Sequence, residues 1–215
     1  MKSVIPRTIG PVLVVVAAAT ACSSATGGQA GAEQAALARA AANRRPANPA
    51  DVRFMQGMVP HHAQAVLMAR MAPSHDASQA LRILCERIIV AQGDEITWMR
   101  NWLADQGQEV PAADATHMRM RMGGVEHDML MPGMLTPEQL AQLDAARGSE
   151  FDRLFLTFMI QHHEGALTMI DELFGSYGGA QDDDVFKIAS DMYADQTTEI
   201  DFMQKMLDAQ SGGRP

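Results

Sequence analysis

Apolar residues recur at intervals of three and four in the second quarter of the chain, which is the spacing of one face of an α-helix. The first such stripe follows Pro49 and contains Phe54, Met55, Met58, Val59, His62, Val66 and Ala69. This helix is predicted to end near Pro73, because proline cannot continue the hydrogen-bond ladder of a helix. Ser74 can then cap a second helix, which is expected to extend to about Gln106.

A third helix is predicted to begin at residues that commonly start helices. Thr136 is a suitable N-cap, Pro137 occupies the first helical position, and Gln139 stands three residues after the cap. This helix is expected to extend to about Phe174 and to bend at Gly148, which is followed by serine.

A long segment, residues 108–135, separates the two predicted pairs of helices. It contains Gly-Gly and Pro-Gly pairs and six Met, and it shows no sustained period, so it is predicted to be a loop. After the third helix, Gly178 and Gly179 break the chain, and apolar residues three and four apart predict a fourth helix over about residues 182–209.

An internal repeat relates the two helix pairs. In the first helix, six residues match the same residue type 101 positions later, namely Phe54, Met58, His61, His62, Ala65 and Met68. In the second helix, five residues match at an offset of 104, namely Gln92, Glu95, Ile96, Met99 and Leu103. Such self-similarity indicates a duplicated helical hairpin. Two hairpins pack most simply as a four-helix bundle, so the predicted fold class is all-α, with a long Met/His-rich connecting loop.

The beginning of the chain has the design of an export signal. Lys2 and Arg7 precede an apolar run, and small residues lead to Cys22. This pattern resembles a bacterial lipoprotein signal with Cys22 as the lipidated residue; the alternative is an ordinary secretory peptide with an incidental cysteine. The expected organisation is a signal peptide over residues 1–21, a lipidated cysteine and flexible tether over 22–48, a four-helix domain over 49–209 and a tail over 210–215.

Charge and motif content narrow the function. The net charge is −9 and there is no long basic run, so nucleic acid is not an expected partner. No later stretch is apolar enough to span a membrane, so we expect the protein outside the cytoplasm, on the cell membrane, and in contact with lipid through its anchor only. The motifs of zinc proteases, serine hydrolases, phosphate-binding loops and haem attachment are absent, and no catalytic constellation is visible; the one enzymatic alternative left open is a redox enzyme that uses a bound metal.

Methionine and histidine supply the candidate chemistry. The chain has 17 Met but only 5% aromatic residues, so core filling alone does not account for the Met content. On a helix Met58 lies on the same face as His61 and His62, and Met159 lies on the same face as His162 and His163. Met55, Met68 and Met169 extend these faces. Imidazole and thioether donors favour copper, and Cu(I) in particular. The alternative is that Met lines the core and that one His of each pair is a hydrogen-bonded histidine of the bundle.

Further candidates lie outside the twin histidine pairs. The loop carries His117 and His127 among alternating Met, and it is either a flexible capture site for soft metal or a segment that folds its Met onto the bundle. Gln92 and Gln196 interrupt apolar stripes and could orient the imidazoles, or they could bond each other. The matched residues Glu95 and Glu199 could be solvated. Cys85 lies in an apolar stripe and is expected to be a core residue.

Two stretches resemble a known bacterial family. They are FMQGMVPHHAQAVLMA and MPGMLTPEQLAQLDAARGSEFDRLFLTFMIQHHEGALTMI, and they are similar to the family catalogued as domain of unknown function 305. The resemblance covers about residues 49–208. It implies a ferritin-like four-helix fold, export and, for some members, copper binding and copper tolerance. The family's His-His pairs fall on the two pairs described above; its second pair usually follows proline, whereas Gln161 stands there in this chain.

Together these observations favour a lipid-anchored protein that binds copper and buffers it or transfers it. Its expected partners are the metal ion and either a copper-handling protein or a second copy of the chain. The alternative is a structural or interaction lipoprotein that binds no metal.

Overall fold

The computed structural model describes residues 31–32, 35 and 46–212. The chain divides into two compact units, residues 1–45 and 46–215, and the account below concerns the second. Cys22 and the predicted signal peptide lie outside the described residues. Within the described residues no helix is long and apolar enough to cross a membrane.

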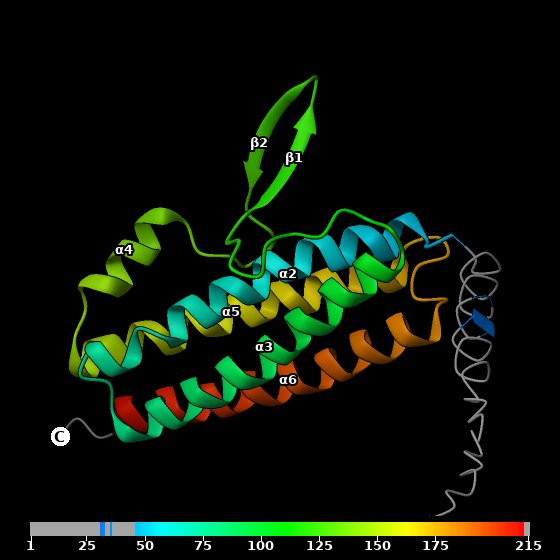
Figure 1. Cartoon of the computed structure of the whole chain (residues 1–215). Coiled ribbons are helices and arrows are strands. Elements are labelled where there is room, and N and C mark those ends of the chain that lie inside the picture. Colours follow the sequence, from blue (N-terminus) through cyan, green and yellow to red (C-terminus); the bar gives the residue numbers. More distant parts are fainter. Residues whose placement is uncertain (1–30, 33–34, 36–45, 213–215) are drawn as a thin grey trace, which may run out of the picture. The chain divides into compact units, whose positions relative to one another are not determined.

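The described chain is mostly helical, which confirms the all-α class. Four long helices in this part of the chain lie alongside one another (Figure 1): α2 (Pro49–Ala69), α3 (Gln79–Asp105), α5 (Gly148–Gly175) and α6 (Asp183–Gly212). A 3-10 turn, η1 (Ala72–Ser74), joins α2 to α3, and a short helix, α4 (Pro137–Ala145), precedes α5. The close pairings are α2 with α3, α5 with α6 and α2 with α5, whereas α3 and α6 are in looser contact.

Side-chain caps explain where the helices begin. The Thr136–Gln139 capping box is present, as predicted, with the Thr136 hydroxyl accepting from the backbone of Gln139 and the Gln139 amide oxygen accepting from the backbone of Thr136. The cap of α3 is Ser78 and not Ser74, because the chain forms the 3-10 turn first. Asp182 accepts from the backbone N–H groups of Asp184 and Val185 at the start of α6.

Two predictions about the middle of the chain were wrong. The predicted continuous third helix is broken at Ala146 and Arg147, which have extended backbone, and Gly148 has a φ of +58°. This break allows the Gly148 N–H to donate to the carbonyl of His75 at 2.9 Å. The predicted loop contains a hairpin of β1 (Met118–Met122) and β2 (Val125–Met129). It turns at Gly123 and Gly124, whose positive φ values are typical of a two-residue hairpin turn.

The apolar core forms two clusters at opposite ends of the helices. The first combines the N-terminal half of α2, the C-terminal halves of α3 and α5, and the N-terminal half of α6. The second combines the C-terminal half of α2, the N-terminal halves of α3 and α5, and Met203 of α6. Each helix is therefore antiparallel to its neighbours. Since α3 and α5 end at the same end of the molecule, the connection between them must run the length of the helices.

Two buried aspartates, 101 positions apart, tie each hairpin to the turn of the other. Asp51 on α2 accepts from the backbone N–H of Ala180, in the α5–α6 connection, at 2.7 Å. Asp152 on α5 accepts from the backbone N–H of Ser78, in the α2–α3 connection, at 3.1 and 3.2 Å. Both carboxylates are less than 5% exposed. The repeat seen in the sequence is thus matched by equivalent long-range contacts.

The segment 131–135, called here the covering segment, crosses the faces of α2 and α5. Gln64 of α2 makes two hydrogen bonds to the backbone of Leu135, and Gln161 of α5 donates to the carbonyl of Gly133 at 3.1 Å. Gly133 has a φ of +76° and lies against Gly165 of α5. A Cβ atom on Gly165 would overlap the carbonyl of Pro132, so this approach requires glycine.

Gly165→Ala is therefore expected to destabilise the protein. The added methyl group would displace the covering segment, and we expect the free energy of unfolding to fall by about 1–3 kcal/mol. Gly93→Ala is the matched control, because Gly93 lies within α3 and a Cβ there meets no atom within 4 Å; it is expected to raise stability by about 0.5–1 kcal/mol. Urea unfolding of both variants measures this difference. Equal stability of the two variants would contradict the proposed close approach.

Candidate metal centre

Four histidines lie in the middle of the molecule, between the two apolar clusters. His61 and His62 are in the centre of α2, and His162 and His163 are in the centre of α5. All four side chains have 0% exposure. The structure thus brings the two predicted pairs together, and they are called here the histidine layer.

The two helices contribute to this layer in equivalent ways. The rings of His61 and His162 meet across the α2–α5 interface, with centroids 3.8 Å apart and planes tilted by 38°. Each ring lies 6.3 Å from the ring of its neighbour in sequence, His62 or His163. His61 and His162 therefore form the centre of the layer, and His62 and His163 lie outside them.

The outer histidines are each held by a carboxylate from the partner helix of the same hairpin. His62 Nε2 is 2.7 Å from Glu95 Oε2 of α3, and His163 Nε2 is 2.8 Å from Glu199 Oε2 of α6. The two glutamate side chains are 16% and 15% exposed, so they lie between the buried rings and the surface. A carboxylate only accepts, so each outer ring donates from Nε2.

The inner histidines have fewer partners. His61 Nε2 is 3.0 Å from the carbonyl of Pro132 in the covering segment, and it must donate because a carbonyl only accepts. Neither ring nitrogen of His162 has a hydrogen bond of good geometry in the described part of the chain, although the backbone of His61 is a polar neighbour of the ring that acts to raise its pKa. Throughout the layer, each of the four Nδ1 atoms is buried and lacks a hydrogen-bond partner among the described residues.

Burial keeps the inner rings neutral. The pKa of His61 is lowered to about 3, chiefly by burial away from water, with repulsion from His62 as a further cause. The pKa of His162 is lowered well below its usual value, again by burial first and then by repulsion from the other rings of the layer. A neutral ring that donates from Nε2 carries its lone pair on Nδ1. His61 therefore presents an unused electron pair in a site without water contact.

His75 shows what a structural histidine looks like in the same protein. Its side chain is 5% exposed, and both ring nitrogens have partners. Nδ1 lies 2.8 Å from the carbonyl of Met71, and Nε2 lies 3.0 Å from the carbonyl of Asp144. The histidine layer differs in leaving at least one nitrogen of every ring, and both nitrogens of His162, unpaired within the described residues, which argues against a purely structural role.

Thioethers flank the histidine layer on both sides. Met58 of α2 and Met99 of α3 lie in the first apolar cluster, and Met159 of α5 and Met203 of α6 lie in the second. The other predicted Met, namely Met55, Met68 and Met169, are also buried. Met99 and Met203 were not predicted as site residues, although their repeat at an offset of 104 is visible in the sequence. The described residues contain no group of three or more His, Cys, Asp or Glu placed to hold a metal ion.

Gln92 and Gln196, for which the sequence left two interpretations open, make no hydrogen bond to the histidines or to each other among the described residues. Both side chains are 3% exposed, but neither amide atom of Gln92, and not the Oε1 of Gln196, has a hydrogen-bond partner among the residues described. Glu95 and Glu199, one helical turn further along, hold the rings instead. The signal that could have identified them is the same one that identified the glutamines, namely a polar residue repeated beside an apolar stripe.

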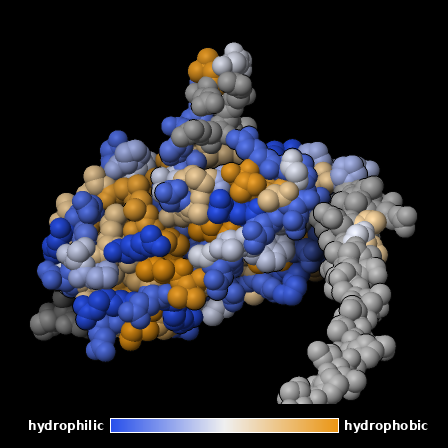
Figure 2. Space-filling model, in the orientation of Figure 1, coloured by the Kyte–Doolittle hydropathy of each residue, from blue (hydrophilic) through white to orange (hydrophobic). Residues whose placement is uncertain are grey.

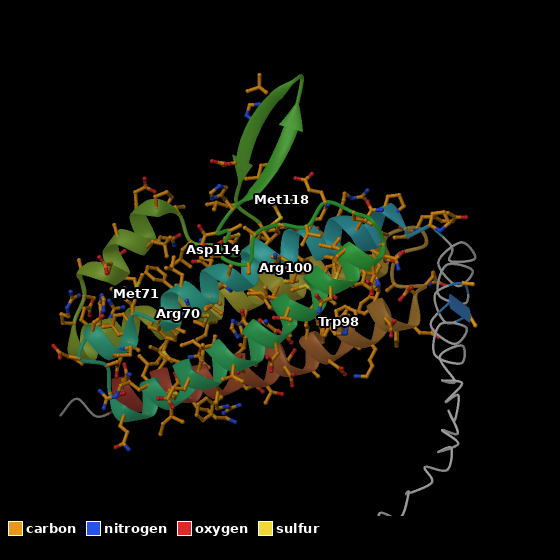
Figure 3. All side chains as sticks on the ribbon, in the orientation of Figure 1. Arg70, Met71, Trp98, Arg100, Asp114 and Met118 are labelled. Atoms are coloured by element: carbon orange, nitrogen blue, oxygen red, sulfur yellow. The ribbon has the colours of Figure 1, made fainter. Side chains whose placement is uncertain are left out.

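The remaining candidates lie away from the histidine layer. His127 is exposed on β2, and His117, half-exposed just before β1, lies 3.3 Å from Asp128. Met118 is at the base of this hairpin, next to α2 (Figure 3). Cys85 is buried in the second apolar cluster, as predicted, and burial raises the pKa of its thiol to about 12, so it is not a thiolate ligand at neutral pH.

Comparison with known proteins identifies relatives with this fold. A family model described as "Domain of unknown function (DUF305)" matches residues 51–207. A DUF305 protein from Streptomyces coelicolor is similar in structure, with a TM-score of 0.62 and 25% identity over 75% of this chain and 94% of that chain. A DUF305 fragment from Deinococcus radiodurans also has a TM-score of 0.62 and 25% identity, over 77% of this chain and 99% of the other. No curated protein matches the chain.

A third similar structure is that of the protein CopM. Its Cu(I)-bound form has a TM-score of 0.56 and 28% identity, over 74% of this chain and 96% of that chain. CopM has also been solved in Cu(II)-bound, Ag-bound and apo forms. A relative of this chain thus binds copper and silver.

The lowered pKa values predict a pH dependence of stability for the metal-free protein. In the unfolded chain His61 and His162 bind protons near pH 6.5, whereas in the folded protein they bind them only at much lower pH. The unfolded state therefore binds more protons below pH 6.5, and stability that is fully present above this value is lost as the pH falls. Each ring contributes up to about 1.4 kcal/mol per pH unit.

Urea unfolding between pH 7.5 and 4.5 measures this dependence. We expect a shallower pH slope in the double variant His61→Gln/His162→Gln than in the wild type. The variant His75→Gln, which removes a histidine with two bonded nitrogens, is the control for general acid sensitivity. An unchanged slope in the double variant would show that the inner rings are not held neutral by burial.

Proposed function

The chain belongs to the DUF305 family, and from this premise we propose that it binds copper, as Cu(I), in the histidine layer and serves to buffer or transfer it. The observation that carries the proposal is the set of four buried Nδ1 atoms without hydrogen-bond partners among the described residues. An unpaired polar atom in a protein interior costs about 1–3 kcal/mol. Coordination of a metal ion would offset that cost.

The donor types favour a soft ion. Neutral imidazole and thioether bind Cu(I) well, whereas Mg²⁺ and Ca²⁺ require oxygen ligands. The similarity to CopM, which has been solved in Cu(I)-bound and Ag-bound forms, supports the same choice. Thioether sulfur also suits an oxidising compartment, because it forms no disulfides.

The negative charge of two carboxylates beside the histidine layer favours a cationic ligand. The carboxylates of Glu95 and Glu199 are largely buried and point at imidazoles, and none of their hydrogen bonds involves a lysine or arginine in the described chain. A monovalent cation bound at the Nδ1 atoms would bring positive charge close to both carboxylates. The same carboxylates fix each outer ring with Nε2 protonated and Nδ1 free, which is how metal-binding histidines are usually oriented.

Roles can be assigned to the individual residues within this proposal. His61, His62, His162 and His163 supply nitrogen, and Met58 and Met159 supply sulfur from the same helices. Met55, Met68 and Met169, with Met99 and Met203, provide further thioethers in the flanking clusters. Glu95 and Glu199 are positioning residues, since they act through the rings that they hold.

We also propose that the four long helices form a ferritin-like four-helix bundle. It would consist of two duplicated helical hairpins, each of which contributes one His-His pair, one Met and one Glu. The equivalent pairs His62–Glu95 and His163–Glu199 support this duplication. The crossed contacts of Asp51 and Asp152 support it as well.

The proposed setting is outside the cytoplasm. Export would use residues 1–21, and a lipid on Cys22 would attach the domain to the cell membrane through residues 22–48. The β-hairpin, with His117, His127, Met118 and Met129, would be a second group of soft donors at the surface. It is the proposed point of exchange with a copper-handling protein or with a second copy of this chain.

A competitive Cu(I) titration under reducing conditions tests the function. We expect tight binding by the wild type and loss of that binding when His61, His62, His162 and His163 are replaced by Ala. Because four core substitutions can also unfold the protein, the pair Met58→Leu/Met159→Leu provides a second test. These volume-conserving changes cost less than about 1.5 kcal/mol each in stability.

The Met pair is expected to weaken Cu(I) binding by about tenfold or more, at the lower end of the effect of losing a donor. Met192→Leu is the matched control, because Met192 is a buried Met of α6 that has no Met counterpart in the repeat. Wild-type affinity in the Met pair together with wild-type affinity in a folded histidine variant would refute the proposal.

A further inference from the structure

A cleft of about 580 Å³ lies between α3 and α6, where the helices are in looser contact. Glu95 and Gln92 of α3 and Glu199 and Gln196 of α6 line it, together with Glu86, Arg87 and Asp195. Figure 2 shows apolar side chains reaching the surface along α3 among hydrophilic ones, and Val90, which lines the cleft, is 64% exposed. The cleft is therefore open to solvent and has a mixed polar and apolar wall.

The cleft reaches the histidine layer through hydrogen-bonded groups. Glu95 and Glu199 line the cleft, and each also accepts from the outer histidine of its own hairpin, His62 or His163. The opposite side of the layer is closed, because the covering segment bonds to His61 and packs tightly on Gly165. The cleft side therefore offers polar side chains between solvent and the outer histidines, whereas the covering segment packs against the other side of the layer.

Two buried amides line this path. Gln92 and Gln196 are 104 positions apart, 3% exposed and part of the cleft wall. Both amide atoms of Gln92 and the Oε1 of Gln196 lack hydrogen-bond partners in the described chain. Unbonded amide groups in this position do not stabilise the fold, and their oxygens are free to contact a passing cation.

The charge of the cleft is negative. Four carboxylates and one guanidinium, that of Arg87, are the charged groups among the described lining residues. The pKa of Asp195 is raised, by burial first and then by repulsion from Glu95, Glu199 and Asp191, with Arg87 acting in the opposite direction. A cleft lined by one sign of charge concentrates ions of the opposite sign.

We propose that the α3–α6 cleft is the port through which a soft monovalent cation enters and leaves the histidine layer. The carboxylates at the rim and wall attract the hydrated ion. The amide oxygens of Gln92 and Gln196 replace part of the hydration shell of the ion. The ion then passes to the imidazoles behind Glu95 and Glu199. This inference rests on the proposed function, since it assumes that the histidine layer binds the ion.

Stopped-flow mixing of the protein with Ag(I) tests the port, with the fluorescence of Trp98 and Trp102 on α3 as the readout. Ag(I) is the probe because it is soft, monovalent and stable without a reductant. In Glu86→Gln/Asp195→Asn we expect loading to slow by about tenfold and its salt dependence to weaken. The control Glu164→Gln/Asp171→Asn removes the same charge from exposed positions on α5 that do not line the cleft, and it is expected to load like the wild type.

The pair Gln92→Leu/Gln196→Leu separates a relay from a structural role. If the glutamines relay the ion, their replacement should slow loading and release by the same factor. The equilibrium affinity should then stay within about threefold of the wild-type value. The metal-free variant should also unfold at a higher temperature, because two unpaired buried amides are removed. A structural role would instead lower the unfolding temperature and leave loading unchanged.

The outcomes distinguish the port from the function on which it rests. Absence of Ag(I) uptake by the wild type would overturn the proposed function. Uptake by the wild type with normal loading in both cleft variants would overturn the port alone. Equal slowing in the α5 control would also overturn it, because the effect would then come from net charge and not from the cleft.

Discussion

The burial of four imidazoles without enough hydrogen-bond partners is the constraint on which the rest of this structure depends. In a dry interior a charged imidazole is strongly disfavoured, which is why the pKa of His61 falls to about 3. The rings must still be held in defined orientations. Glu95, Glu199 and the carbonyl of Pro132 do this from three directions, and all three act on Nε2. Their common effect is that Nε2 is the donor in His61, His62 and His163, so Nδ1 is the nitrogen without a hydrogen-bond partner among the described residues.

The route of the chain follows from the directions of the helices, and it decides which side of the histidine layer is covered. Because α3 and α5 end at the same end of the molecule, residues 106–147 have to return along the helices, and they do so over α2 and α5. That return places the covering segment over His61 and seals one side of the histidine layer. The α3–α6 side has no such cover within the described residues and keeps its cleft. A single topological requirement thus produces one closed face and one open face.

The sequence predicted the helices and the histidine layer because both leave strong local signals. The stripe after Pro49, the capping box at Thr136 and the repeat around the His-His pairs depend on residues close together in the chain. The hairpin was missed because its strands are built from Met, Arg and charged residues instead of β-branched ones, and the break before α5 was missed because it depends on a distant bond from Gly148 to His75. The sequence left open which of Gln92 and Glu95 meets His62 for a similar reason, since this is decided by the rotation of α3 against α2.

The central claim is that the free Nδ1 atoms of the histidine layer are metal ligands, and ¹⁵N NMR of histidine-labelled protein tests it most directly. On addition of Cu(I), which is diamagnetic, the Nδ1 resonances of His61, His62, His162 and His163 should shift strongly. The Nε2 atoms of His62 and His163 should stay protonated on Glu95 and Glu199, and His75 should be unaffected. Uptake of Cu(I) that leaves these four Nδ1 resonances unchanged would contradict the account.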